Sequence, residues 1–211
     1  MTEIGLFPLP LVLVPTERIP LHIFEERYKE LIGECIESGE AFGLVLATGD
    51  GAVHEVGTKA TVDQVLDTLD DDTLNIVVEG RERFRLLELT SGRSFTTCLI
   101  EPVVDDDELP TPEESARAYE LFQQLAEATS ADVDFPSPDT AQLDFELAAR
   151  VDFGVDAKQE LIALTSPRRR MQRLAELLEV AIETTAVQQA LRERAGRNGK
   201  VSPLDPDHNE P

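Results

Sequence analysis

The spacing of the apolar residues is mainly that of strands before residue 104 and only that of helices after residue 112, and this change limits the possible folds more than any other feature. Before residue 104, apolar and polar residues alternate in short runs, which is the pattern of half-buried strands. After residue 112, apolar residues recur every three or four positions, as they do on one face of a helix. The sequence therefore predicts an α+β chain. It has a β-rich module at residues 1–104, an acidic, proline-containing linker at 105–112, a helical module at 113–196 and a disordered tail at 197–211.

Several short strands are predicted within the β-rich module. The candidate strands are residues 4–14, 19–24, 42–47, 55–68, 73–79, 82–89 and 94–103. Pro8 and Pro10 in the first of them predict an edge strand, because proline has no amide hydrogen to donate to a neighbouring strand. Glu79-Gly80-Arg81 predicts a turn between two later strands. Short strands at this spacing favour a small barrel or a curled sheet.

One helix is predicted inside the β-rich module. Apolar residues from Tyr28 to Ile36 follow the helical spacing i, i+3, i+4, i+7, i+8. Gly39 then occupies the position where glycine commonly ends a helix. We predict that the rings of Phe24 and Tyr28, and that of Phe84 on a later strand, are structural anchors in the core.

About four helices are predicted in the helical module. They cover residues 113–129, residues 141–151, a stretch beginning at Asp156 and a long final stretch that ends near Gly196. Ser166 is a candidate N-cap for the last helix, and Pro167 suits its first turn.

The charge balance bears on the kind of partner. The chain has 42 acidic and 19 basic side chains, which give a formal net charge of −23. This charge repels phosphate backbones and anionic membrane surfaces, since both associate through lysine and arginine. The composition therefore predicts no nucleic-acid partner and no membrane partner.

Nothing in the sequence predicts export or insertion into a membrane. The first three residues lack the basic charges of a signal peptide, and no apolar run approaches the ~20 residues that span a bilayer. Cys35 and Cys98 belong to apolar patterns and are predicted to be small buried hydrophobic residues. We therefore expect a cytoplasmic protein.

The common catalytic and metal-binding motifs are missing from the sequence. No G-x-x-x-x-G-K-[ST] loop occurs, which excludes ATP hydrolysis by that route, and no serine lies in a G-x-S-x-G elbow. His22, His54 and His208 are isolated, and the two cysteines have no C-x-x-C partner. The sequence therefore predicts no enzyme, no catalytic residue, no cofactor and no metal.

Two clusters remain as candidates for ligand contacts. The first is PLHIFEERY at residues 20–28, and the second is EGRERFR at residues 79–85. A structural role is favoured for both, with the arginines paired to nearby acids. The functional alternative is that His22, Arg27 and Arg81 contact a ligand.

The same two clusters, together with LFPLP at residues 6–10 and Phe42-Gly43, resemble the Lon substrate-binding (Lon N-terminal) domain family. The resemblance covers roughly residues 4–190, and it departs at Glu26, where the family usually has proline. It implies a PUA-like β pseudo-barrel with one inserted helix, followed by a C-terminal helical bundle. It also implies a stand-alone substrate-recognition domain without the ATPase and protease domains.

The function predicted from the sequence is a non-catalytic module that binds proteins or peptides, such as an adaptor or a chaperone-like factor. The expected partners are unfolded or tagged protein segments, together with a protease or chaperone. The segments are expected to bind at the junction of the two modules or, as a second choice, at an exposed strand edge near residues 6–8. Two alternatives stay open: an RNA-binding PUA-like protein, and a small-molecule enzyme of unrecognised type that uses His22, Arg27 and Arg81. The sequence does not fix the oligomeric state.

Overall fold

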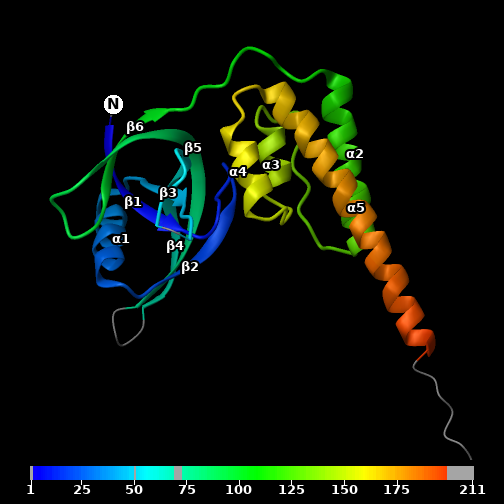
Figure 1. The fold of residues 1–211 in the computed structure, drawn as a ribbon, viewed down its shortest axis with the longest axis horizontal. Coiled ribbons are helices and arrows are strands. Elements are labelled where there is room, and N and C mark those ends of the chain that lie inside the picture. The colour runs from blue at the N-terminus through cyan, green and yellow to red at the C-terminus, as the bar shows by residue number, and fades with distance from the viewer. Residues whose placement is uncertain (1, 50, 69–72, 199–211) are drawn as a thin grey trace, which may run out of the picture.

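A β barrel lies beside a helical bundle in the computed structural model, which describes residues 2–49, 51–68 and 73–198 (Figure 1). This confirms the predicted α+β fold. The barrel module contains β1 (Thr2–Leu9), β2 (Arg18–Ile23), α1 (Glu26–Ser38), β3 (Phe42–Leu46), β4 (Val56–Thr68), β5 (Leu74–Thr90) and β6 (Thr97–Pro102). The helical module contains α2 (Pro112–Thr129), α3 (Leu143–Ala148), α4 (Val155–Ala163) and α5 (Pro167–Asn198). Of the predicted disordered tail, residues 199–211 lie outside the described residues.

The sheet closes on itself through its longest strand. The strand order is β2-β5-β4-β3-β1-β6, and β5 also pairs with β6, so five strands form a closed ring. β5 has 17 residues, and its first part pairs with β2 on one side and β4 on the other. β2 therefore joins the barrel from outside. Its second edge pairs with no other strand in the described ranges.

β5 corrects one prediction, because the expected turn at Glu79-Gly80-Arg81 lies inside a continuous strand. Gly80 is present for a different reason. A Cβ atom on Gly80 would lie 2.2 Å from the carbonyl oxygen of Val14. The Gly80 carbonyl accepts a hydrogen bond from the N–H of Thr16 at 2.9 Å, and its own N–H donates to the carbonyl of Glu17 at 2.8 Å. Glycine therefore lets the segment after β1 pack directly on the backbone of β5.

β1 corrects a second prediction. It lies between β3 and β6 and is not an edge strand. Residues 2–5 pair with β6, whereas residues 6–9 pair with β3. On the β6 side, the N–H of Leu6 donates to the carbonyl of Thr96 at 2.8 Å. Pro8 faces the same side two residues later, beyond the last pairing with β6, so its missing amide hydrogen costs no strand hydrogen bond.

The helices begin and end close to the predicted residues. Gly39 has the left-handed φ of 72° and donates its N–H to Cys35 at 2.9 Å, which ends α1 as predicted. The Ser166 side chain accepts the N–H of Arg169 at 3.2 Å, as an N-cap residue does. α3 is shorter than the predicted stretch of residues 141–151.

The hydrophobic core of the bundle continues into the barrel. α2, α3, α4 and α5 contribute most of this cluster, with Phe122, Leu147 and Leu174 among its buried members. Four buried residues of the barrel module belong to the same cluster: Val12, Val14, Leu46 and Val56. The two modules therefore share one apolar interface.

Candidate binding surface

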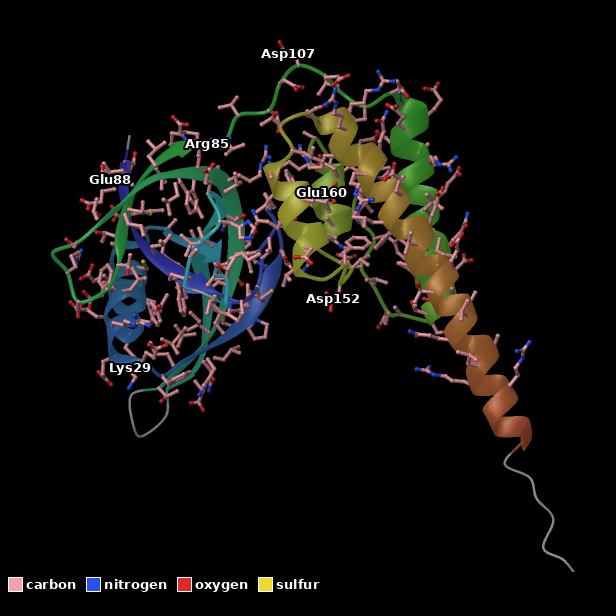
Figure 2. All side chains as sticks on the ribbon, in the orientation of Figure 1. Lys29, Arg85, Glu88, Asp107, Asp152 and Glu160 are labelled. Atoms are coloured by element: carbon pink, nitrogen blue, oxygen red, sulfur yellow. The ribbon has the colours of Figure 1, made fainter. Side chains whose placement is uncertain are left out.

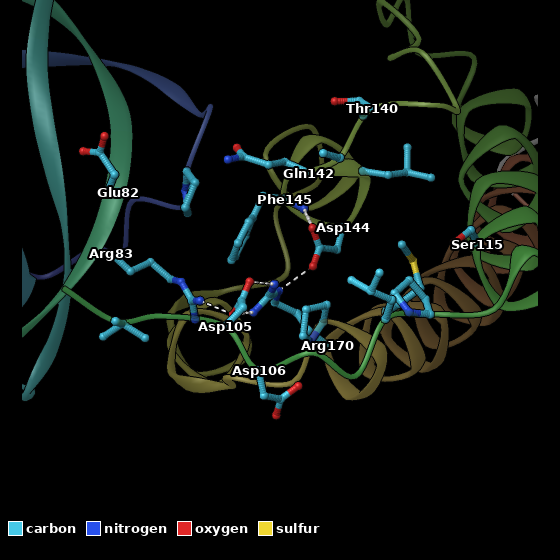
Figure 3. Close-up of a pocket in the computed structure, with 18 of the residues that line it drawn as sticks. Glu82, Arg83, Asp105, Asp106, Ser115, Thr140, Gln142, Asp144, Phe145 and Arg170 are labelled. Atoms are coloured by element: carbon cyan, nitrogen blue, oxygen red, sulfur yellow. Dashed lines mark hydrogen bonds and ion pairs between the residues drawn. The ribbon is translucent and has the colours of Figure 1, made fainter.

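A buried ion-pair network closes the junction between the barrel and the bundle (Figure 3). Asp105 forms ion pairs with Arg83 of β5 and Arg170 of α5, the second at 2.7 Å. Arg170 also binds Asp144 of α3 at 2.5 Å. Arg83 and Arg170 are only 4% and 2% exposed. Four segments that are far apart in the sequence thus meet in one network.

The donors and the charges of this network are used within the chain. The Arg83 guanidinium also donates to the carbonyls of Ile162 at 2.8 Å and Leu164 at 2.7 Å. Both arginines lie over the ring of Phe145, at 5.2 and 4.2 Å from its centroid. Burial by itself raises the pKa of Asp105, but hydrogen bonds and attraction from Arg170 and Arg83 outweigh it and lower that pKa. The network is therefore suited to holding the modules together.

The linker is part of the same junction. The N–H of Asp106 donates to the carbonyl of Thr165, and the N–H of Arg168 donates to the carbonyl of Glu108, both at 2.9 Å. The Ser166 hydroxyl donates to the Glu108 carboxylate at 2.8 Å. These contacts tie the linker to the helical module.

A cleft of about 540 Å³ lies beside the network, and it includes Arg81. Four acidic side chains and three arginines line it: Glu82, Asp105, Asp106, Asp144, Arg81, Arg83 and Arg170. Arg81 itself donates to the Thr61 hydroxyl at 2.9 Å and pairs with Glu79 at 3.1 Å. This charge balance gives the cleft no excess of positive charge for a phosphate.

The three candidate ligand residues do not converge. His22 shares a hydrogen bond of 2.8 Å with Asn75, and Arg27 pairs with Glu25 at 2.8 Å. Arg81 lies six residues beyond Asn75 on β5, which is about 20 Å along an extended strand. His22 and Arg81 are therefore too far apart to contact one small molecule together.

Phe24 corrects the prediction that it is a core anchor, because its side chain is 62% exposed. Ile23, the last residue of β2, is 1% exposed and points into the core. Successive side chains of an extended segment point to opposite sides, so Phe24 points outward, where its ring lies 6.0 Å from that of His22. Tyr28 and Phe84 are buried, at 7% and 0% exposed.

A groove runs along β2 where the barrel meets the bundle, with a volume of about 390 Å³. We call it the β2 groove. It is lined by Leu11, Val12, Glu17, Ile19, Pro20, Ala149, Arg150, Val151, Asp152 and Lys158. Figure 1 shows β2 on the side of the barrel that faces the bundle. The groove thus has six apolar and four charged lining residues, and two of the apolar ones belong to the outer strand β2.

The charges around the β2 groove are largely paired. Lys158 binds Glu17 at 2.5 Å, and Arg150 binds Glu146 at 2.8 Å. Arg150 also donates to the carbonyl of Asp134 at 2.7 Å. Away from the groove, Figure 2 labels the acidic residues Glu88, Asp107 and Glu160, which are all exposed. The groove therefore mixes apolar and charged side chains, and three of its four charged residues are held in ion pairs.

The sequence contained a signal for this surface that the prediction did not use. Pro20 lies in the second predicted strand, and proline within a strand favours an edge position. The structure places the open edge at β2, whereas the prediction placed it at β1. The buried network had no such signal, because its arginines and aspartates look like any other charged residues in a sequence rich in both.

The described residues offer little for covalent or metal chemistry. They contain no group of three or more His, Cys, Asp or Glu side chains arranged to hold a metal ion. Burial raises the pKa of both thiols, Cys35 and Cys98, to about 11, so neither is a thiolate near neutral pH. In the same ranges, no helix is both long enough and apolar enough to cross a bilayer.

Comparison with known proteins identifies one family. The family of the ATP-dependent protease La (LON) substrate-binding domain matches residues 3–180. The Lon protease of Rhizobium meliloti (strain 1021) is 27% identical over an alignment 215 residues long. The alignment covers 93% of this chain and 27% of that protein. The Lon protease of Anaeromyxobacter dehalogenans is 26% identical and covers 79% of this chain and 22% of its own length. The chain thus spans about a quarter of the length of these relatives.

Two solved structures have the same fold. The Lon N-terminal domain protein from Xanthomonas campestris superposes with a TM-score of 0.66 at 26% identity, over 82% of this chain and 97% of that one. The N-terminal domain of the Mycobacterium avium complex Lon protease has a TM-score of 0.65 at 16% identity, over 84% of this chain and 98% of that one.

Proposed function

The chain belongs to the family of the Lon substrate-binding domain, and from this premise we propose that it binds extended apolar segments of other proteins along β2. The observation that carries the proposal is the open edge of β2, which has the β2 groove beside it and the exposed ring of Phe24 beyond its end. Unfolded or tagged proteins are the clients that expose such segments, which fits an adaptor or a chaperone-like factor.

The physical basis of binding is strand addition. An extended segment can form main-chain hydrogen bonds with an open strand edge, while its side chains enter neighbouring apolar pockets. Phe24 lies five residues beyond Ile19, which is about 17 Å along an extended chain. A client segment of five or six residues therefore spans the groove and reaches Phe24. Pro20 removes one donor from the edge, which favours weak and reversible binding.

We propose no reaction at this surface. His22 shares a hydrogen bond with Asn75, and burial raises the pKa of the Cys35 and Cys98 thiols, so none of these three residues is set up as a base or nucleophile. Binding of structured RNA is disfavoured by the net charge of −23 and by the pairing of Arg81, Arg83 and Arg85 with acids.

Phe24→Ala is expected to weaken the binding of an unfolded apolar peptide by about tenfold, because exposed aromatic rings supply a large share of the energy at such contacts. The measurement is a fluorescence anisotropy titration with a labelled, permanently unfolded peptide. Binding by the unmodified chain should persist in ~1 M salt, since apolar contacts are not screened.

The matched control is Leu89→Ala, which removes another exposed apolar side chain, 53% exposed, near the C-terminal end of β5 and away from β2. This variant should bind the peptide normally. If Leu89→Ala and Phe24→Ala weaken binding equally, or if affinity disappears at high salt, the β2 surface is not the binding site. If the unmodified chain binds no unfolded peptide, the proposed function itself is wrong.

A further inference from the structure

One carboxylate in the β2 groove has no cation to pair with. The charged residues that line the groove are Glu17, Arg150, Asp152 and Lys158. Lys158 pairs with Glu17 at 2.5 Å, and Arg150 pairs with Glu146 at 2.8 Å. Asp152 forms no ion pair within residues 2–49, 51–68 and 73–198. Both cationic side chains of the groove are thus engaged, and one negative charge is left over.

The Asp152 side chain is held in a fixed orientation. It lies in the short connection between α3 and α4, where it is exposed (Figure 2). Its Oδ1 atom accepts the N–H of Gly154 at 3.0 Å, which restrains the carboxylate. The other oxygen, Oδ2, accepts no hydrogen bond from the described part of the chain. A carboxylate that is already oriented loses little side-chain entropy when it binds a cation.

The segment that carries Asp152 is acidic as a whole. Residues 143–163 contain five acidic and two basic side chains: Asp144, Glu146, Asp152, Asp156, Glu160, Arg150 and Lys158. Three of the acids form ion pairs, which are Asp144 with Arg170, Glu146 with Arg150 and Glu160 with Arg173. Asp152 and Asp156 form none within the described ranges, and of these two only Asp152 lines the groove. The unpaired charge on this side of the groove is therefore negative.

The lysine, arginine and carboxylate side chains at the two ends of β2 are paired within the chain. The pairs are Arg18 with Asp63, Arg18 with Glu79, Glu25 with Arg27, and Glu26 with Lys29, at 2.8 to 3.6 Å. A client that lies along β2 therefore meets paired charges beside Phe24. The unpaired carboxylate lies at the other end of its path, in the groove beside Ile19 and Pro20.

We propose that the preferred clients of the β2 groove are extended apolar segments with a lysine or arginine at one end, and that Asp152 binds this cation. The inference rests on the proposed function, because it concerns the same surface. The apolar part of the client covers β2 and reaches Phe24, while its cation lies in the groove. The net charge of −23 adds a long-range attraction for basic segments.

The direction of β2 determines where the cation stands in the client sequence. β2 runs from the groove at Ile19 towards Phe24. A client that pairs antiparallel, which is the slightly more stable arrangement, runs the other way and reaches the groove with its C-terminal end. The preferred client therefore has its lysine or arginine after the apolar residues.

Fluorescence anisotropy with a set of labelled peptides tests the proposal. Each peptide has the same apolar residues followed by one lysine, glutamine or glutamate. In ~0.1 M salt, the lysine peptide should bind about fivefold more tightly than the glutamate peptide, as expected for an exposed ion pair. In ~1 M salt this difference should disappear while apolar binding remains, because charges are then screened beyond ~3 Å. A lysine placed before the apolar residues should give a smaller preference.

Two variants test whether the preference comes from Asp152. Asp152→Asn can keep the hydrogen bond to Gly154 through its amide oxygen, and it should abolish the preference for lysine. Asp152→Lys should reverse the preference. The matched control is Asp107→Lys, which changes the net charge equally at an exposed acid that does not line the groove. Figure 2 shows Asp107 well away from Asp152, so this variant should keep the preference.

The outcomes separate this proposal from the function on which it rests. If no peptide binds, the proposed function is wrong. If the peptides bind but lysine and glutamate make no difference, the proposed function stands and the role of Asp152 is overturned. Equal effects of Asp107→Lys and Asp152→Lys would assign the preference to net charge and would also overturn that role. A stronger preference for lysine before the apolar residues would overturn the antiparallel arrangement.

Discussion

Replacing Arg170 with methionine should lower the free energy of unfolding by about 3–5 kcal/mol, because removing one partner of a buried ion pair leaves the other charge buried and unpaired. Asp144 is 6% exposed and would lose its ion pair of 2.5 Å with Arg170. Asp105 would keep only Arg83 as a cationic partner. Urea unfolding at neutral pH measures the loss.

Arg173→Met is the matched control for this change. Arg173 lies on the same helix and forms two ion pairs, with Glu160 at 2.9 Å and Glu176 at 3.0 Å. These pairs are exposed to solvent, so losing them should cost less than about 1 kcal/mol. Adding Asp144→Asn to Arg170→Met should recover part of the loss, since it removes the unpaired carboxylate. Equal losses for Arg170→Met and Arg173→Met would contradict a central role for the network.

The same network predicts that the folded chain loses stability as the pH falls. The pKa of Asp105 lies below its ordinary value of 3.8 in the folded chain. Its stabilising effect is therefore complete above pH 3.8 and is lost as the pH falls through the lower, folded value. Outside this network, the N–H of Thr111 lowers the pKa of Glu114 from 4.5 to about 2, helped by Gln172 and Arg168, so the contribution of Glu114 disappears between those two pH values.

Phe84→Ala should lower the free energy of unfolding by about 3–5 kcal/mol, which is the usual cost of removing a large ring from a core. Phe84 is fully buried, and glycines on β3 and β4 make room for its ring. A Cβ atom at Gly43 or Gly57 would lie 2.9 or 2.8 Å from the Cζ atom of Phe84. The ring therefore fills a space that the surrounding strands are built around.

Phe24→Ala makes the same chemical change at an exposed position and is the control for this prediction. Its free energy of unfolding should stay within about 0.5 kcal/mol of the unmodified chain, as is usual for surface positions. Thermal and urea unfolding of both variants provide the comparison. A large loss of stability in Phe24→Ala would show that this ring has a structural role that its exposure does not reveal.

The features that the sequence predicted correctly depend on residues that are close together in the chain. The stripe from Tyr28 to Ile36 and the stop at Gly39 define α1 without any distant contact. The N-cap of α5 at Ser166 is equally local. Fold class followed from the change in periodicity, because that pattern also needs no knowledge of contacts.

The features that were predicted incorrectly depend on distant segments. From the sequence, Gly80 resembles a turn residue. The structure shows that glycine is needed there because the carbonyl of Val14 packs against its backbone. Ile23 and Phe24 are adjacent apolar residues, and only the position of the core shows which of them is buried. The candidate ligand residues were chosen for their residue types. The structure places His22 on β2 beside the start of β5, whereas Arg81 lies in the middle of β5.

The apolar interface shared by the barrel and the bundle has a consequence for biosynthesis. The ribosome synthesises the barrel residues of this cluster, Val12, Val14, Leu46 and Val56, first. Leu174 and Leu178 of the same cluster follow more than a hundred residues later. At ~5–20 residues per second, a ribosome needs several seconds to add them. During this interval the nascent barrel exposes these apolar side chains to solvent. The nascent chain is therefore most prone to aggregate during this period of synthesis.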